Sequence, residues 1–115
     1  YLCQTDLLQA INGPIDIIVS NPPYLNNEEM LSLEPELKHE PRCALDGGID
    51  GLYLTRRLFQ QASVCLASSG CLVVEISTER LHQTMQIAEA IDTETTVLVD
   101  NDLTGSPRVM IVKFS

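Results

Sequence analysis

Hydrophobic and polar positions along the chain show two kinds of pattern, short apolar runs and helical spacing, which predict alternating strands and helices. Residues 15–20, Ile-Asp-Ile-Ile-Val-Ser, form a short β-branched run that two prolines end. Such a run is typical of a buried strand that opens into a loop. Further strands are predicted at residues 71–76, 95–99 and 108–114. Because the strand predicted at residues 15–20 is apolar nearly throughout, we expect it to have a neighbouring strand on each side.

Helical spacing of apolar residues separates these strands at two places. Asp50 is predicted to cap a helix that starts near Gly51, and Ser68-Ser69-Gly70 is predicted to end it. A second helix is predicted at residues 78–91. The inward faces are expected to carry Leu54, Leu58, Ala62, Cys65 and Leu66 in the first helix and Leu81, Met85 and Ala88 in the second.

Residues 25–50 are polar and rich in Glu and Pro, which predicts a long loop with one helical turn near Glu28–Leu33. Long loops in compact domains are usually functional or disordered. A turn around residues 104–107 joins the last two strands. The order of elements therefore predicts an α/β sheet of parallel βαβ units with a final antiparallel strand.

The tetrapeptide Asn21-Pro22-Pro23-Tyr24 carries the most informative chemistry, because ligands of open α/β sheets bind beyond the carboxyl ends of strands. An amide or ring amine nitrogen is a poor nucleophile, since its lone pair is delocalised. Two fixed acceptors that bind both N–H groups would turn that lone pair toward an incoming methyl group. Asn21 offers a side-chain carbonyl and Pro22 a stiffly held backbone carbonyl, while Tyr24 offers a flat face. A simple strand-ending turn is the alternative interpretation.

Composition narrows the class of protein. The chain has 115 residues, 44% of them hydrophobic and 20% charged, which is ordinary for one globular domain. No apolar run approaches the roughly 20 residues that span a bilayer. The formal net charge of −9 argues against nucleic acid as a partner, because Lys and Arg supply most of that affinity. Since the first residue is Tyr, we interpret the chain as a piece of a longer protein.

The four cysteines show no CxxC spacing and no nearby pair of histidines. We therefore predict no metal site and interpret Cys3, Cys43, Cys65 and Cys71 as reduced thiols of an intracellular protein. His39 and His82 are expected at the surface. Glu75, at the end of a buried strand, is expected either to line the site or to be purely structural.

The motifs resemble those of the release-factor glutamine N5-methyltransferases of the HemK/PrmC type. The tetrapeptide Asn21–Tyr24 matches their signature, and residues 40–51, Glu-Pro-Arg-Cys-Ala-Leu-Asp-Gly-Gly-Ile-Asp-Gly, match their E-P-x-x-A-L-x-G-G-x-D-G stretch. Asp6-Leu7-Leu8 and Arg108-Val109 match two shorter steps. The tetrapeptide alone is shared with adenine methyltransferases, so the longer stretch makes the resemblance specific.

The resemblance implies the C-terminal half of a class I, Rossmann-like methyltransferase sheet. Residues 1–115 would be the C-terminal portion of one catalytic domain and supply its last four strands of seven. The glycine loop that holds most of the cofactor, S-adenosylmethionine, would lie outside this chain. We therefore expect this chain alone to be inactive and to bind the cofactor poorly.

Site roles follow from the same resemblance. Asn21 would touch both the cofactor and the substrate amide. Asp6 and Leu7 would lie beside the adenine ring of the cofactor. The residues that would shape the substrate slot are Pro22, Pro23 and Tyr24.

The resemblance implies methyl transfer to the glutamine of the Gly-Gly-Gln tip of a peptide-chain release factor. An adenine N6-methyltransferase acting on DNA or RNA is one alternative. A non-catalytic methyltransferase-like partner is another. The compartment is expected to be intracellular, cytoplasmic or mitochondrial.

Overall fold

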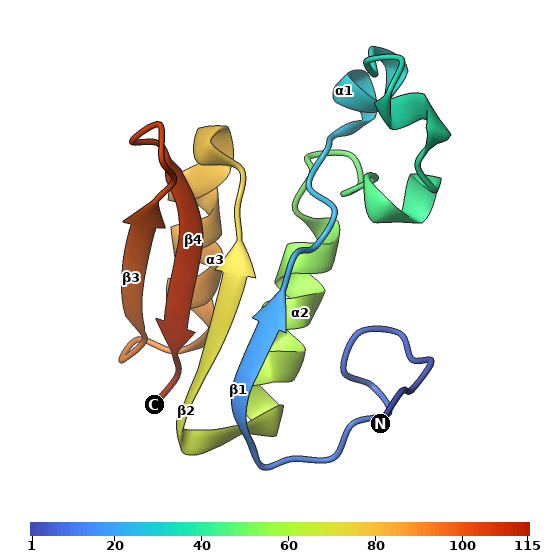
Figure 1. Cartoon of the computed structure of the whole chain (residues 1–115). Coiled ribbons are helices and arrows are strands. Elements are labelled where there is room, and N and C mark those ends of the chain that lie inside the picture. The colour runs from blue at the N-terminus through green and yellow to red at the C-terminus, as the bar shows by residue number, and fades with distance from the viewer.

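Four strands form one mixed sheet in the computed structural model, which describes residues 1–115 (Figure 1). They are β1 (Ile15–Ser20), β2 (Leu66–Glu75), β3 (Thr96–Asn101) and β4 (Pro107–Lys113). Their order across the sheet is β1-β2-β4-β3. β1 and β2 are parallel, whereas β4 is antiparallel to both of its neighbours. The predicted α/β sheet with a final antiparallel strand is thus confirmed.

Two helices, α2 (Tyr53–Cys65) and α3 (Leu81–Ile91), cover one face of this sheet (Figure 1). Strand side chains alternate between the two faces, so every second residue meets the helices. Phe59 of α2 is fully buried and packs edge-on against Phe114, with 6.5 Å between ring centroids. The remaining buried members of this core are Ile18, Leu58, Ala62, Leu72, Val74, Ile76, Ala88, Met110 and Val112.

The opposite face of the sheet carries no helix (Figure 1). Ile17 and Val19 of β1 are 61% and 75% exposed, and Leu98 of β3 is 57% exposed. β1 also lies at the edge of the sheet, since it pairs only with β2. The second neighbour that the apolar sequence of β1 predicts is therefore not supplied by these 115 residues.

The predicted end of the first helix is wrong. α2 ends at Cys65, and Leu66 begins β2 instead of lying on the helix face. Leu66 pairs with Ile15, and the register of the two strands then shifts before Ile17 pairs with Cys71. Ser68-Ser69-Gly70 therefore lie within β2, at the register shift between its two paired parts, instead of ending the helix.

The predicted start of the same helix, near Gly51, is two residues too early. α2 begins at Tyr53 after Leu52, and Asp50 does not cap it. Gly51 has a φ of +79°, a left-handed conformation that no right-handed helix contains. The Asp50 carboxylate instead accepts a hydrogen bond from the Leu52 N–H, 3.0 Å away.

The other expected elements lie close to their predicted positions. The helix expected at residues 78–91 is a 3₁₀ turn, Thr78–Arg80, followed by α3. The turn expected near Glu28–Leu33 is α1 (Asn27–Leu31), capped by the Asn26 side chain. Two further 3₁₀ turns lie within residues 25–50, at Leu37–His39 and Arg42–Ala44, and the sequence did not predict them.

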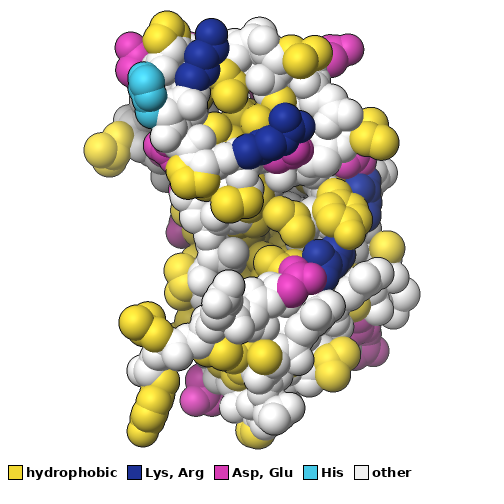
Figure 2. Space-filling view, turned by 90° about the vertical axis from the view of Figure 1, so that its right-hand side faces the viewer, with side chains coloured by type: hydrophobic (Ala, Val, Ile, Leu, Met, Phe, Trp, Pro, Cys, Tyr) yellow, Lys and Arg dark blue, Asp and Glu magenta, His cyan; other side chains and the backbone are white.

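None of the helices has the length and the apolar character that crossing a membrane would require. Figure 2 looks onto the free edge of β1. A hollow there, with hydrophobic side chains inside it, separates the lobe of residues 25–50 from the N-terminal segment.

Candidate functional site

The tetrapeptide follows β1 directly, at the edge of the sheet where β1 and β2 both end (Figure 1). A cavity of about 220 Å³ lies beside it. The lining residues are Asn21, Pro22, Tyr24, Leu25, Leu37, Glu40, Ala44, Leu45 and Glu75. Three of the four tetrapeptide residues are thus brought to one cavity, and Pro23, which is partly buried, does not line it.

Two hydrogen-bond acceptors in this tetrapeptide are free. Asn21 is exposed and its side chain has no hydrogen-bond partner within the chain. Pro22 is buried, and its carbonyl accepts no hydrogen bond from the backbone. Because no donor of the chain occupies either oxygen, both acceptors are available to a ligand that donates N–H groups.

Residues 45–47 hold the tetrapeptide loop in place. The Leu25 N–H donates to the Leu45 carbonyl at 3.0 Å, and the Gly47 N–H donates to the Leu25 carbonyl at 2.8 Å. These two bonds form an isolated parallel bridge between Leu25 and Asp46. The Glu-Pro…Asp-Gly motif and the Asn-Pro-Pro-Tyr motif are therefore in direct contact.

Gly51, the last residue of the stretch 40–51, also lies against the tetrapeptide. A Cβ atom at Gly51 would lie 2.4 Å from the Tyr24 carbonyl oxygen, closer than any side chain permits. A Cβ atom at Gly47 would likewise lie 2.6 Å from the Gly51 carbonyl oxygen. Glycine is required here because two backbone segments pass against each other.

Two carboxylates, Glu40 and Glu75, line the cavity and form neither a hydrogen bond nor an ion pair within the chain. Their charge makes the cavity attractive to groups that donate hydrogen bonds and repellent to anions. Glu75 thus lines the cavity, which is the first of the two roles predicted for it.

The carboxylates of the neighbouring motif serve the loop instead. The pKa of Asp46 is lowered because its carboxylate accepts the Gly48 N–H and pairs with Arg42. The pKa of Asp50 is lowered chiefly by its hydrogen bonds from Arg56. Both groups are therefore ionised turn residues.

Asp6 and Leu7 do not line the cavity beside Asn21. The Asp6 carboxylate pairs with Arg57 at 2.6 Å, and Leu7, with a φ of +53°, packs against the core. Their expected place beside an adenine ring stays a prediction.

The cavity is too small for a whole nucleotide-sized cofactor and has room only for a small group. Sites for whole drug-sized ligands usually measure about 300–1,000 Å³, whereas this cavity measures about 220 Å³. Its free acceptors and carboxylates fit an amide group and a methyl-bearing cation. Within the chain, no group of three or more His, Cys, Asp or Glu side chains is placed to hold a metal ion.

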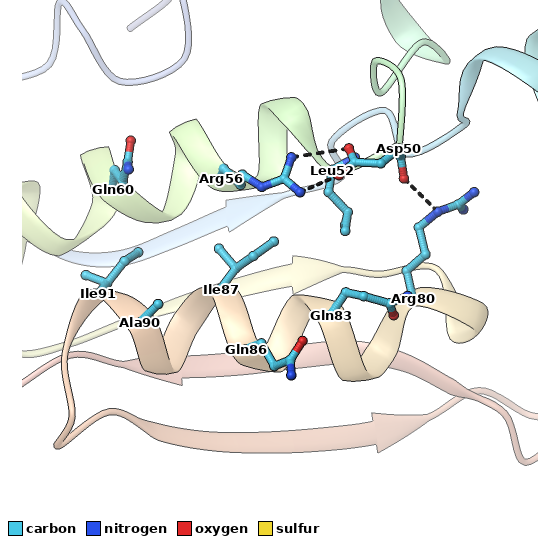
Figure 3. A pocket seen from close by; sticks show the side chains of 10 residues that line it. All are labelled: Asp50, Leu52, Arg56, Gln60, Arg80, Gln83, Gln86, Ile87, Ala90 and Ile91. Atoms are coloured by element: carbon cyan, nitrogen blue, oxygen red, sulfur yellow. Dashed lines mark hydrogen bonds and ion pairs between the residues drawn. The ribbon is translucent and has the colours of Figure 1, made fainter.

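Sequence reasoning missed the apolar wall of the cavity, which Leu37, Ala44 and Leu45 provide. These residues are rare apolar positions in a polar loop, and that contrast was the available signal. A larger cavity of about 560 Å³ lies between α2 and α3 and contains no tetrapeptide residue (Figure 3). The residues predicted to bind an amide therefore line the smaller cavity and not the larger one.

No protein-family model matches the chain. It is 40% identical over 108 residues to the release factor glutamine methyltransferase of Bradyrhizobium diazoefficiens, covering 90% of this chain and 35% of that protein. It is 36% identical over 109 residues to the release factor glutamine methyltransferase of Rhodospirillum rubrum, covering 94% of this chain and 33% of that protein. It is 44% identical over 79 residues to the ribosomal protein uL3 glutamine methyltransferase of Neisseria gonorrhoeae, covering 69% of this chain and 26% of that protein.

The chain spans about a third of the length of the release factor enzymes that it matches. Its mixed sheet, in which the antiparallel strand β4 lies between β2 and β3, matches the C-terminal half of a class I methyltransferase sheet. Within that class, the chain belongs to the HemK/PrmC-type glutamine methyltransferases.

Proposed function

We propose that this chain forms the substrate-binding portion of a protein glutamine N5-methyltransferase that uses S-adenosylmethionine. It would be the C-terminal part of one catalytic domain, and the rest of the domain would hold most of the cofactor. The observation that carries the proposal is the pair of free acceptors, Asn21 and Pro22, at the carboxyl end of β1.

The reaction needs an amide nitrogen whose lone pair is directed at a methyl group. The Asn21 side-chain carbonyl and the Pro22 backbone carbonyl would each accept one N–H of the substrate amide. Holding both N–H groups fixes the plane of the amide, so that the nitrogen lone pair points at the methyl group. When bound, S-adenosylmethionine supplies an electrophilic methyl group next to Asn21.

The remaining cavity residues would assist this orientation. Tyr24 offers a flat apolar surface to the planar amide. Glu40 and Glu75 favour a donor-rich amide over a carboxylate of the same shape, so the cavity would reject glutamate. No histidine is required, because the nitrogen loses its proton only after methylation.

The glutamine of the Gly-Gly-Gln tip of a release factor is the substrate that we propose first. The support is the name of the relatives from Bradyrhizobium and Rhodospirillum, which match nine-tenths or more of the chain. Ribosomal protein uL3 is the second candidate, because the Neisseria relative is named for it. Either substrate would place the protein inside the cell.

The deciding experiment uses the parent protein with labelled S-adenosylmethionine. Four acceptors would be compared, namely a release factor, the same factor with its Gly-Gly-Gln glutamine replaced by alanine, uL3, and adenine-containing DNA. Label on the intact factor alone supports the first proposal, and label on uL3 alone supports the second. Label on DNA would indicate an adenine methyltransferase, and no label at all would indicate a non-catalytic partner.

Replacing Asn21 tests the proposed acceptor. We expect Asn21→Ala in the parent protein to lower kcat by about 100-fold or more, the usual effect of losing one orienting group. Stability should be unchanged, since Asn21 is exposed and makes no hydrogen bond within the chain. Single-turnover methyl transfer and thermal melting check both points. Wild-type kcat in the variant would remove Asn21 from the mechanism.

A further inference from the structure

Arg80 is a buried cation that no sequence motif singled out. It is only 9% exposed and ends the 3₁₀ turn between β2 and α3. This position lies just beyond the carboxyl end of β2, next to the strand that carries the tetrapeptide. A buried charge costs free energy unless it is paired and hydrogen-bonded, so its partners explain its presence.

All three nitrogens of the Arg80 guanidinium have partners. Nε donates to the Asp50 carbonyl at 3.0 Å, and Nη1 donates to the Ser77 hydroxyl at 3.3 Å. Nη2 pairs with the Glu29 carboxylate in α1. One side chain therefore ties together segments that are 51 and 30 residues away from it in the sequence.

Both tied segments adjoin the tetrapeptide. Gly51, next to Asp50, passes against the Tyr24 carbonyl, and its Cβ would also lie 3.0 Å from Arg80 Nε. Glu29 belongs to the helical turn that follows Leu25 after a single residue. Arg80 does not line the cavity of Asn21, but it lines a second cavity together with Tyr24 and Leu25.

Figure 3 shows how this bond differs from a neighbouring one. Arg56 of α2 also binds Asp50, but through the half-exposed carboxylate. Arg80 reaches the backbone carbonyl of Asp50 from the other side. Exposed ion pairs contribute about 0–1 kcal/mol, so the Arg56 pair does little to fix the backbone.

We infer that Arg80 is a positioning residue for methyl transfer. It holds the Asp50-Gly51 backbone and α1 against Tyr24, and so fixes the loop that presents the acceptors of Asn21 and Pro22. This inference rests on the proposed function. Orientation of the amide requires a rigid loop, and Arg80, which lies outside the cavity of Asn21, would provide this rigidity.

The test compares three variants of the parent protein, Arg80→Met, Arg80→Lys and Arg56→Met. Arg80→Met should lower kcat by about 100-fold, as displacement of a catalytic group by about 1 Å does. Arg80→Lys should restore kcat only in part, because an ammonium group lacks the planar fork that reaches several partners at once. The KM for S-adenosylmethionine should stay unchanged in all three. Arg56→Met, which also removes a cation from Asp50, should keep wild-type kcat.

Thermal melting separates positioning from simple unfolding. If Arg80→Met loses its folded state, Arg80→Lys and Glu29→Gln carry the test. A loss of kcat that only follows the folded fraction would overturn the inference, and so would wild-type kcat in folded Arg80→Met.

Amide hydrogen exchange gives a readout that does not depend on methylation. Exchange of the Leu25 and Gly47 amides, which bind across the loop, should be faster in Arg80→Met than in Arg56→Met. If the wild-type parent methylates nothing, the proposed function fails, while faster exchange still supports Arg80 as the residue that positions the loop. Equal exchange in the two variants contradicts it.

Discussion

Gly51 shows how one residue without a side chain shapes the site. Its φ of +79° is left-handed, and the Tyr24 carbonyl occupies the space of a Cβ atom. Gly105, in the turn between β3 and β4, has a similar φ of +86° but nothing within 4 Å of an added Cβ. Gly105 is therefore required only by its backbone conformation, whereas Gly51 is required both by its conformation and by the close approach of Tyr24.

Substitution by alanine should reveal this difference. Gly105→Ala should lower the free energy of unfolding by about 1–2 kcal/mol, the cost of a left-handed conformation. Gly51→Ala should cost about 1–3 kcal/mol more, because the loop must also move away from the added methyl group. Urea denaturation of both variants measures the difference. Equal losses would mean that the loop tolerates the methyl group.

At the scale of elements, the turn between β3 and β4 is organised by one carboxylate. Asp102 accepts hydrogen bonds from the Thr104 hydroxyl and from the Thr104 and Ser106 N–H groups, and it pairs with Arg108. These bonds lower the pKa of Asp102 from 3.8 to about 2. The carboxylate therefore stabilises the turn only while it is ionised.

The pH dependence of stability follows from this lowered pKa. Because the folded pKa lies below the unfolded one, the contribution of Asp102 is complete above pH 3.8 and disappears as the pH falls toward about 2. Asp102→Asn should remove that part of the acid dependence while leaving the side-chain shape. Unfolding free energies measured between those pH values for both proteins test this. An unchanged slope in the variant would show that Asp102 does not titrate with folding.

Local patterns predicted most elements, because a strand such as β1 and a helix face such as that of α2 depend on nearby residues. The start of β2 could not be predicted this way. Gly70 reads locally as a helix end, yet it lies where a Cβ would meet the Ile15 carbonyl at 2.8 Å. The tetrapeptide was predicted because its chemistry is contiguous. Arg80 was missed because its partners are distant in the sequence.

At the scale of the whole molecule, the chain exposes apolar surface on one face and an unpaired edge. Ile17 and Val19 lie on the face that no helix covers, and β1 has a free edge beside them. Such edges and faces pair with other chains unless something covers them. This edge and this face are therefore open to a further strand and a further packing layer.

The isolated chain should therefore self-associate. We expect sedimentation velocity to show mass rising with concentration, and Val19→Lys to reduce it, because a charge on this face opposes pairing. Leu103→Lys is the control, since Leu103 is also an exposed apolar residue but lies in the turn beyond β3. An equal effect of both lysines would assign the association to net charge rather than to this face.

The position of β4 between β2 and β3 also sets the order in which the sheet can form. As the chain leaves the ribosome, β3 emerges before β4, and β3 has no other strand to pair with. β4 also supplies two fully buried core residues, Met110 and Val112. Among the four strands described here, a nascent chain that has not yet reached Pro107 can thus pair only β1 with β2. Synthesis of β4 is the event that attaches β3 to the sheet, and premature termination even slightly upstream of it would leave β3 unattached.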